Sequence, residues 1–326
     1  MRLHREAPAR VQGPVTPPGL ELVEADLDPG RLRAVEDLLF ATQPEMGRTV
    51  EEMLARSPLA PDTRRVIAYL EGEPVGLATV GRIWVQPPDY PTLWSEVGVL
   101  EHARRRGIGS ALLAWAQAGG RAAGKEQLRI PCSDGRPEGI AFLARRGFRE
   151  FDRMTTLELP LAGREAPAVD APAGIAIATL AERPDLREAA YRLAVEIYAA
   201  LPDPEPVSAG TFEEWRLRDV DVPNAPLDGY LLALAGDEPV GYCRLYVHDR
   251  GRSVGHLMTG VTAAWRGRGV ASALKRAGLG WALAYGAERM TTENAQGNEP
   301  MLAINRGFGY RPTPDFVEMD GPVADG

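Results

Sequence analysis

Arg104-Arg105-Arg106-Gly107-Ile108-Gly109-Ser110 is repeated later in the chain as Arg266-Gly267-Arg268-Gly269-Val270-Ala271-Ser272. Both stretches read R-x-x-G-x-(G/A), and both follow an apolar segment that predicts a strand. Both also open a segment with apolar residues three or four positions apart, which predicts an amphipathic helix. The two motif arginines are 162 residues apart in a chain of 326 residues. This spacing indicates two related halves.

The repeat extends beyond the motifs. Glu73-Pro-Val-Gly76 matches Glu238-Pro-Val-Gly241 at an offset of 165, and Gly98-Val99 matches Gly260-Val261 at an offset of 162. A three-residue difference in the intervening hairpin loop accounts for the change of offset. Because chance rarely preserves an offset over several elements, we infer an internal duplication.

Hydrophobic periodicity predicts the same order of elements in both halves. Strands are expected over 20–25, 65–71, 75–85, 93–100, 128–132 and 153–159, then over 175–180, 229–235, 240–248, 256–261, 290–294 and 315–319. The last strand is expected to close the second half. Helices are expected over 31–41, 49–56 and 138–146, over 186–201, 211–218 and 300–306, and after each motif. We expect a flexible tail over 1–18, domains over 19–160 and 175–326, and a proline-rich linker over 161–174.

Composition restricts the class of protein. The 45 acidic and 37 basic side chains give a net charge of −8, which argues against a nucleic-acid-binding protein. No apolar run reaches the roughly 18 residues that a membrane helix needs, and the N-terminus lacks the apolar region of a secretory signal. Neither Cys132 nor Cys243 has metal-ligand spacing. We therefore expect reduced thiols, no metal site and a cytoplasmic location.

The motif has the chemistry of a phosphate-binding loop. The first amides of a helix lack partners within the helix, and the helix dipole places partial positive charge there. Glycines let a bulky anion approach the backbone, and arginines add charged donors. A Walker loop would need GxxxxGK(S/T), which is absent, and a dinucleotide fingerprint would need glycine where this chain has Leu112 or Leu274. The motif predicts a pyrophosphate ligand.

Val97-Gly-Val99 followed by Arg104-x-x-Gly107-x-Gly109 resembles the acyl-CoA-binding motif of the GNAT superfamily of acyl-CoA-dependent N-acyltransferases. Thr259-Gly-Val261 with Arg266-x-x-Gly269-x-Ala271 resembles the same motif. The resemblance covers both halves, so the chain is similar to a tandem GNAT protein. It implies an α/β (α+β) fold with two GNAT-like domains. Each would be a mixed, mostly antiparallel sheet flanked by helices and splayed between its fourth and fifth strands.

By position, the resemblance implies acetyl-CoA as cofactor, with its pantetheine arm on the fourth strand and its pyrophosphate on the motif loop. Asn294, Asn298 and Asn305 resemble an Asn-rich segment that closes over the cofactor in some members of the family. A helix cap and turn is the alternative for these asparagines, and both roles can coexist. The other implied cofactor contacts are Val97, Val99, Arg104, Arg105, Gly107, Ile108, Gly109 and Ser110 in the first half, and Thr259, Val261, Arg266, Gly267, Gly269, Val270, Ala271 and Ser272 in the second.

The catalytic residues depart from the family's pattern. Many members place a Tyr four residues before the glycine that ends the last helix, where it acts as the acid for the leaving thiolate. This chain has Leu143 and Asn305 at that position. Glu96 lies on the strand where the family often carries a carboxylate base. Met258 is its counterpart in the second half, and His256 is close by. Glu96 and His256 are therefore candidate bases, acting directly or through a water. A solvated carboxylate and a hydrogen-bonded structural histidine are the alternatives, and a bulge would change which face each side chain occupies.

We expect an N-acetyltransferase in which a small-molecule primary amine attacks acetyl-CoA directly, in a monomer or homodimer. The alternative is a non-catalytic acyl-CoA-binding or regulatory module in one or both halves. We expect CoA to bind both halves and favour the second as catalytic, because of its asparagines and a group of acidic residues that would attract an amine. A solvated acidic face is the alternative for that group, which comprises Asp203, Glu205, Glu213, Glu214, Asp219, Asp221 and Asp228.

Overall fold

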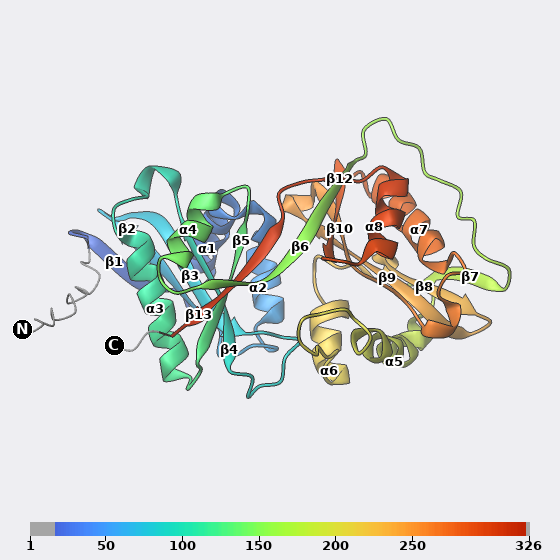
Figure 1. Ribbon diagram of the computed structural model, residues 1–326, viewed down its shortest axis with the longest axis horizontal. Coiled ribbons are helices and arrows are strands. Elements are labelled where there is room, and N and C mark those ends of the chain that lie inside the picture. Colours follow the sequence, from blue (N-terminus) through green and yellow to red (C-terminus); the bar gives the residue numbers. More distant parts are fainter. Residues whose placement is uncertain (1–16, 324–326) are drawn as a thin grey trace, which may run out of the picture.

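The structure of the protein is a computed structural model that describes residues 17–323 (Figure 1). Apart from Pro17 and Pro18, the expected tail lies outside the described residues. The first half contains β1 (Leu20–Glu24), α1 (Pro29–Thr42), α2 (Val50–Arg56), β2 (Arg64–Leu70), β3 (Glu73–Arg82), β4 (Thr92–Val99), α3 (Ile108–Ala122), β5 (Gln127–Ser133), α4 (Pro137–Ala144) and β6 (Arg149–Pro160).

The second half repeats this order. It contains β7 (Ile175–Thr179), α5 (Arg187–Tyr198), α6 (Phe212–Trp215), the π-helical turn η4 (Arg216–Val220), β8 (Tyr230–Ala235), β9 (Glu238–His248), β10 (Ser253–Val261), α7 (Val270–Tyr285), β11 (Arg289–Ala295), α8 (Glu299–Phe308), β12 (Arg311–Pro312) and β13 (Phe316–Pro322). The expected fold class and order of elements are confirmed. Among the described residues, no helix is long and apolar enough to cross a bilayer.

Successive side chains along each strand point to opposite faces of the sheet, so a hydrophobic core forms on each face. In the first half, Ile67 and Leu77 pack with α1, whereas Val66 and Ala78 pack with α3 on the opposite face. In the second half, the core beneath α5 and the core beneath α7 are divided in the same way. Because β2, β3, β8 and β9 are buried on both faces, helices cover the sheet on both sides.

Each half is splayed between its fourth and fifth strands, as expected. The parallel strands β4 and β5 pair only where 92–94 meets 127–129. Likewise, β10 and β11 pair only where 253–256 meets 289–292. Beyond these points the end of the fourth strand keeps only its antiparallel partner, so a gap opens beside it. A bulge occurs in β10 between His256 and Met258, whereas β4 pairs with β3 without a register shift.

The last strands are exchanged between the halves. The sheet order is β1-β2-β3-β4-β5-β13-β6-β11-β10-β9-β8-β7. The final strand of the chain, β13, lies between β5 and β6 and is antiparallel to both. The end of β6, over 154–160, pairs instead with β11 of the second half. Figure 1 shows β6 and β13 crossing between the halves.

This exchange corrects the expectation that the strand over 315–319 closes the second half. Val317 and Met319 are buried with Leu113, Leu128 and Phe148 in the core of the first half. The apolar alternation of the strand identified it as a strand, but alternation does not specify which sheet edge accepts it. Pairing partners are a tertiary property.

Polar contacts also join the halves. Arg82 of β3 binds Glu214 of α6 at 2.9 Å, and Arg250 binds Asp37 of α1 at 3.0 Å. The loop before β4 contributes the Val85 carbonyl, which accepts a hydrogen bond from the amide of Ser208 at 3.0 Å. Together with the continuous sheet, these contacts bring α2 and η4 together, and a cavity lies between them.

Candidate active site

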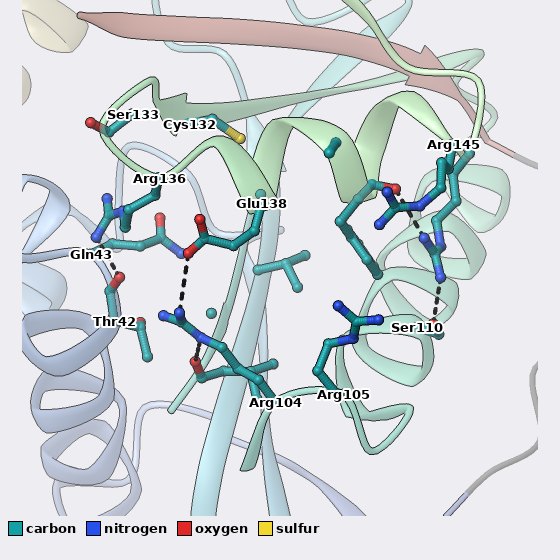
Figure 2. Close-up of a pocket in the computed structure, with 18 of the residues that line it drawn as sticks. Thr42, Gln43, Arg104, Arg105, Ser110, Cys132, Ser133, Arg136, Glu138 and Arg145 are labelled. Atoms are coloured by element: carbon teal, nitrogen blue, oxygen red, sulfur yellow. Dashed lines mark hydrogen bonds and ion pairs between the residues drawn. The ribbon is translucent and has the colours of Figure 1, made fainter. Parts of the chain in front are cut away.

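A cavity of about 560 Å³ occupies the gap beside β4 in the first half; we call it the motif cavity (Figure 2). Its walls are the end of β4, the motif loop with the start of α3, the β5–α4 segment, and the end of α1 at Thr42 and Gln43. Only Ile108, among the residues expected to contact the cofactor in this half, is absent from the wall, because its side chain is buried in the core. The residues that do line the cavity are Val97, Val99, Arg104, Arg105, Gly107, Gly109 and Ser110.

The first glycine of each motif sets the turn into the helix. Gly107 has φ +85° and Gly269 has φ +87°, and each is the N-cap residue of its helix. Residues with a side chain rarely adopt this left-handed conformation. The turn places Gly109 and Ser110, in the first turn of α3, against the motif cavity, where helix amides and the dipole favour an anion.

The first motif arginine anchors the loop in both halves. The Nε of Arg104 donates to the Val99 carbonyl at 3.2 Å, and the Nε of Arg266 donates to the Val261 carbonyl at 3.1 Å. Arg104 also binds Glu138 of α4 at 3.2 Å, as Figure 2 shows. Within residues 17–323, the Arg105 guanidinium makes no hydrogen bond or ion pair, and it extends into the motif cavity. Arg105, unlike Arg104, is therefore free to bind a ligand in the cavity.

Arg105 occupies a strained backbone conformation. Its φ is +63°, and Gly267, the matching residue of the second half, has φ +71°. A non-glycine residue in this region costs about 1 kcal/mol or more. The first half therefore keeps an arginine at a position whose backbone favours glycine, which is consistent with a function for the side chain.

We expect Arg105→Gly to raise the free energy of unfolding by about 1 kcal/mol while weakening CoA binding. The gain comes from relief of strain, and the loss comes from removal of a charged donor. Urea unfolding and titration calorimetry would measure the two effects. The reverse variant Gly267→Arg is the matched control and should lower stability. Tighter CoA binding by Arg105→Gly would contradict a ligand role for this side chain.

The motif cavity is also lined by arginines that lie outside the motif. Arg136 donates to the Thr42 carbonyl at 2.8 Å, and Arg146 donates to the Ser110 hydroxyl at 2.7 Å. Arg145 also lines the cavity. The pair Arg145-Arg146 directly follows α4, so a basic dipeptide at the end of this helix was the available signal. Five arginines against the single Glu138 suit a ligand with several phosphates.

Cys132 of β5 also lines the motif cavity. Burial raises the pKa of its thiol to about 12. The thiol is therefore protonated at neutral pH and is a weak nucleophile. This favours direct attack by the acceptor over a covalent enzyme intermediate on this residue.

Glu96 is fully buried, at 0% exposure, and forms an ion pair with Arg48. The Trp94 Nε1 donates to the same carboxylate at 3.3 Å. Arg48 and Trp94 line a second cavity, of about 300 Å³, which we call the interface cavity. Gly98, two residues beyond Glu96 on the same strand face, lines the motif cavity. Glu96 therefore lies between the two cavities and is not a solvated carboxylate.

His256 lies in a different environment, beneath α7. Its Nδ1 is 3.1 Å from the Cys243 sulfur, and its ring is 6% exposed. Burial, aided by the nearby Lys275, lowers the pKa of His256 well below its usual value. Met258, the counterpart of Glu96, packs into the core beneath α5. These surroundings favour the structural alternative for His256, and its catalytic role stays a prediction.

The asparagines of the second half hold one another and the helix. Asn298 caps α8, since its side chain accepts from the amide of Met301 at 3.4 Å. Asn305 donates to Asn294 at 3.1 Å, and both side chains are buried. The cap role is thus observed, while contact of these asparagines with a cofactor stays a prediction.

The remaining residues implied for the second half surround the motif loop and the end of β10. Val270 is buried in the core as Ile108 is, and the Thr259 hydroxyl donates to the Cys243 sulfur at 3.5 Å. Val261, like Val99, belongs to the end of the fourth strand of its half. Arg266, Gly267 and Gly269 are exposed in the loop, and Ala271 and Ser272 are half-buried in the first turn of α7.

Most of the acidic group before β8 is already paired with arginines. Glu214 binds Arg82, and the buried Asp219 binds Arg218 at 2.8 Å and Arg244 at 3.3 Å. The other ion pairs are Glu205 with Arg129, Glu213 with Arg216, and Asp221 with Arg187 and Arg216. Pairing with arginines weakens the attraction of this group for an amine, and Glu213, with a side chain 62% exposed, is solvated.

The sequence matches the model of the Acetyltransferase (GNAT) family over residues 32–148 and again over residues 187–310. The chain belongs to this family. It is therefore an acetyltransferase with two GNAT units in tandem, as the resemblance implied.

Similar proteins support this assignment. The mycothiol acetyltransferase of Nocardia farcinica is 30% identical over 264 residues, which cover 78% of this chain and 82% of the relative. That of Catenulispora acidiphila is 29% identical over 221 residues, covering 66% and 68%. A tandem GNAT protein from the clavulanic acid biosynthesis pathway has the same fold, with a TM-score of 0.72 and 22% identity over 94% of this chain and 99% of that one.

Proposed function

We propose that this acetyltransferase transfers the acetyl group of acetyl-CoA to a primary amine of a small molecule. The motif cavity carries the proposal, because it combines a splayed fourth strand, a helix N-terminus and five arginines in one gap. Val97 and Val99 would hold the pantetheine arm, and Arg105 with the start of α3 would hold the pyrophosphate. The name of the two mycothiol acetyltransferases supports a small-molecule acceptor.

In the proposed reaction, the amine nitrogen attacks the thioester carbonyl carbon. A C–N bond forms, the C–S bond breaks, and CoA leaves as a thiolate that takes up a proton. The ammonium proton passes to a base. Glu96 is the candidate, because it lies on β4 between the two cavities. Because both cavities border β4, holding amine and thioester on this strand would supply much of the rate.

The geometry favours the first half for the chemistry, although the sequence favoured the second. Glu96 lies between two cavities in the first half, and Met258 takes its place in the second. Neither half carries the family's Tyr, since Leu143 and Asn305 take its place, so the candidate base is what distinguishes the halves. The absence of a carboxylate at Met258 favours a second candidate function for the second half, which is binding of acyl-CoA without catalysis.

Calorimetric titration with CoA tests the two-site prediction. We expect about two sites per chain in wild type and about one in Gly107→Glu or Gly269→Glu, because each variant strains a left-handed turn and adds an anion beside the phosphates. Unfolding curves would show whether each variant is folded. An unchanged stoichiometry in either folded variant would reject the two-site proposal.

A thiol-release assay over amino acids, aminoglycosides, polyamines and peptide N-termini tests the reaction itself. CoA release that depends on an amine supports transfer. Tight CoA binding without release for any amine would instead support the binding module. The domain limits 19–160 and 175–326, the cytoplasmic location and the monomeric or homodimeric state stay predictions, which limited proteolysis, cell fractionation and sedimentation would examine.

A further inference from the structure

The interface cavity is lined by arginines from both halves. Its polar wall comes from β2, β3, β4 and α2 with the residues before it in the first half, and from η4 in the second. No acidic residue is among those that line it. The five arginines are Arg48, Arg56, Arg65, Arg82 and Arg218. Such a concentration of like charge beside a cavity is unfavourable unless anions balance it.

Protein carboxylates balance three of these arginines. Arg48 pairs with Glu96, Arg82 with Glu214 at 2.9 Å, and Arg218 with Asp219 at 2.8 Å. The other two, Arg56 and Arg65, make no ion pair within the part of the chain that the structure describes.

The two unbalanced arginines have few partners of any kind. Arg56 contacts the Asn224 Oδ1 at 3.4 Å and lies over the Trp84 ring. Burial, with the charges of Arg244 and Arg48, lowers its pKa to about 10, so it is a cation at neutral pH. Arg65 makes no side-chain hydrogen bond among residues 17–323. Glu52 and Asp219 act on Arg56, and Glu96 acts on Arg65, only from beyond ion-pair distance. Both guanidiniums can therefore bind a further anion directly.

Unsatisfied polar atoms occur at the same place. The Thr79 hydroxyl, on a residue 6% exposed, has no hydrogen-bond partner, and neither do the buried Nε of Arg56 and one terminal nitrogen of Arg218. Each unsatisfied buried group costs about 1–3 kcal/mol. An oxyanion in the cavity would accept hydrogen bonds from these donors. Trp84 and Trp94 would contact an apolar part of the same molecule.

We propose that the interface cavity binds the carboxylate or phosphate group of the acceptor, so that the acceptor is an amine that also carries an anionic group. The proposal rests on the proposed acetyl transfer. The anion would lie against Arg56, Arg65 and Thr79, and the amine would point along β4 towards Glu96 and the motif cavity. A volume of about 300 Å³ limits the bound part to a small molecule.

Arg48 connects the anion site to the candidate base. Its guanidinium lines the interface cavity and pairs with Glu96. An anion in the cavity would compete for the same guanidinium, leaving the carboxylate better able to accept the ammonium proton. Binding of the anionic group would thus prepare the base.

Matched pairs of amines test the anionic group. Phenylalanine and phenylalaninamide differ in a carboxylate, and phosphoethanolamine and ethanolamine differ in a phosphate. We expect kcat/KM to be about ten- to hundred-fold higher for the anionic member of at least one pair, the effect of a charged hydrogen bond. The pair that shows the difference identifies the anion. Equal or higher kcat/KM for both neutral members would overturn the proposal.

Arg65→Gln tests the residue. We expect KM for the anionic amine to rise about ten- to hundred-fold and KM for its neutral counterpart to stay unchanged. Arg65→Lys should restore part of the affinity. Arg192→Gln, on the outer face of α5 with a side chain 70% exposed, is the matched control and should behave as wild type. An equal rise of KM for both amines would indicate a merely structural role for Arg65.

Thermal shifts separate the anion site from the transfer reaction. With CoA saturating the motif loops, inorganic phosphate or acetate should raise Tm of wild type but not of Arg65→Gln. No shift with either anion would overturn the anion site whatever the enzyme acetylates. A shift together with no turnover of any amine would support the anion site and contradict the proposed transfer.

Discussion

Deletion of residues 314–326 is expected to unfold the first half of the protein, even though these residues come last in the chain. The deletion removes β13, which pairs with both β5 and β6. It also opens the core of the first half, where Val317 and Met319 are buried. Two strand edges with unpaired backbone groups would be exposed in its place.

The expected loss is comparable to the stability of a whole domain. Burial of Phe316, Val317 and Met319 contributes roughly 1.5–3 kcal/mol for each side chain, before backbone pairing is counted. Globular proteins are stable by only about 5–15 kcal/mol. Hydrogen exchange should therefore show loss of protection in β4 and β5, with CoA binding at the motif cavity lost as well.

A synthetic peptide of residues 314–326 provides the control. Added to the deleted protein, it should restore protection in β4 and β5, because an open sheet edge accepts an added strand. Deletion with full protection of β4 and β5 would contradict the exchanged pairing. Unfolding confined to the second half would show that β13 stabilises the sheet to which the sequence assigns it.

Glu96→Gln is expected to lower kcat by about 10²- to 10⁴-fold, the usual contribution of a general base. The substitution keeps the shape of the side chain and removes its ability to take a proton. CoA affinity should stay close to that of wild type, because Glu96 does not line the motif cavity. Steady-state kinetics with the best acceptor and CoA titration would measure the two quantities.

Glu36→Gln is the matched control for this variant. Glu36 is another buried glutamate of the first half, paired with Arg33 at 2.8 Å, and it lines neither cavity. Its replacement should affect stability but not kcat. If Glu96→Gln keeps kcat and raises only KM for the acceptor, then Glu96 positions Arg48 and is not the base.

The sequence was most informative where structure is local. The alternating strand patterns predicted the order of elements, and the motifs predicted a loop that leads into α3 and α7. The structure adds that Gly107 and Gly269 have the left-handed conformation. These features depend on residues close together in the chain. The phosphate chemistry of the motif followed for the same reason, since loop and helix start are contiguous.

Roles that depend on distant partners could not be predicted in the same way. Arg104 and Arg105 are neighbours with similar chemistry in the sequence, yet one binds the Val99 carbonyl and the other extends into the cavity. The acidic residues before β8 form a cluster in the sequence, yet most of them pair with arginines. Two of these arginines, Arg82 and Arg129, come from the other half. Side-chain pairing across the fold decided both cases.

By itself, the sequence determined a duplicated GNAT acetyltransferase, because repeat offsets, periodicity and a short motif are properties of contiguous residues. Only the tertiary structure decided that β13 and β6 exchange sheets and that Arg56 and Arg65 meet Arg218 at one cavity. Strand alternation specifies which face is buried but not which edge is joined. A charge in the sequence likewise does not reveal whether a counter-charge lies beside it.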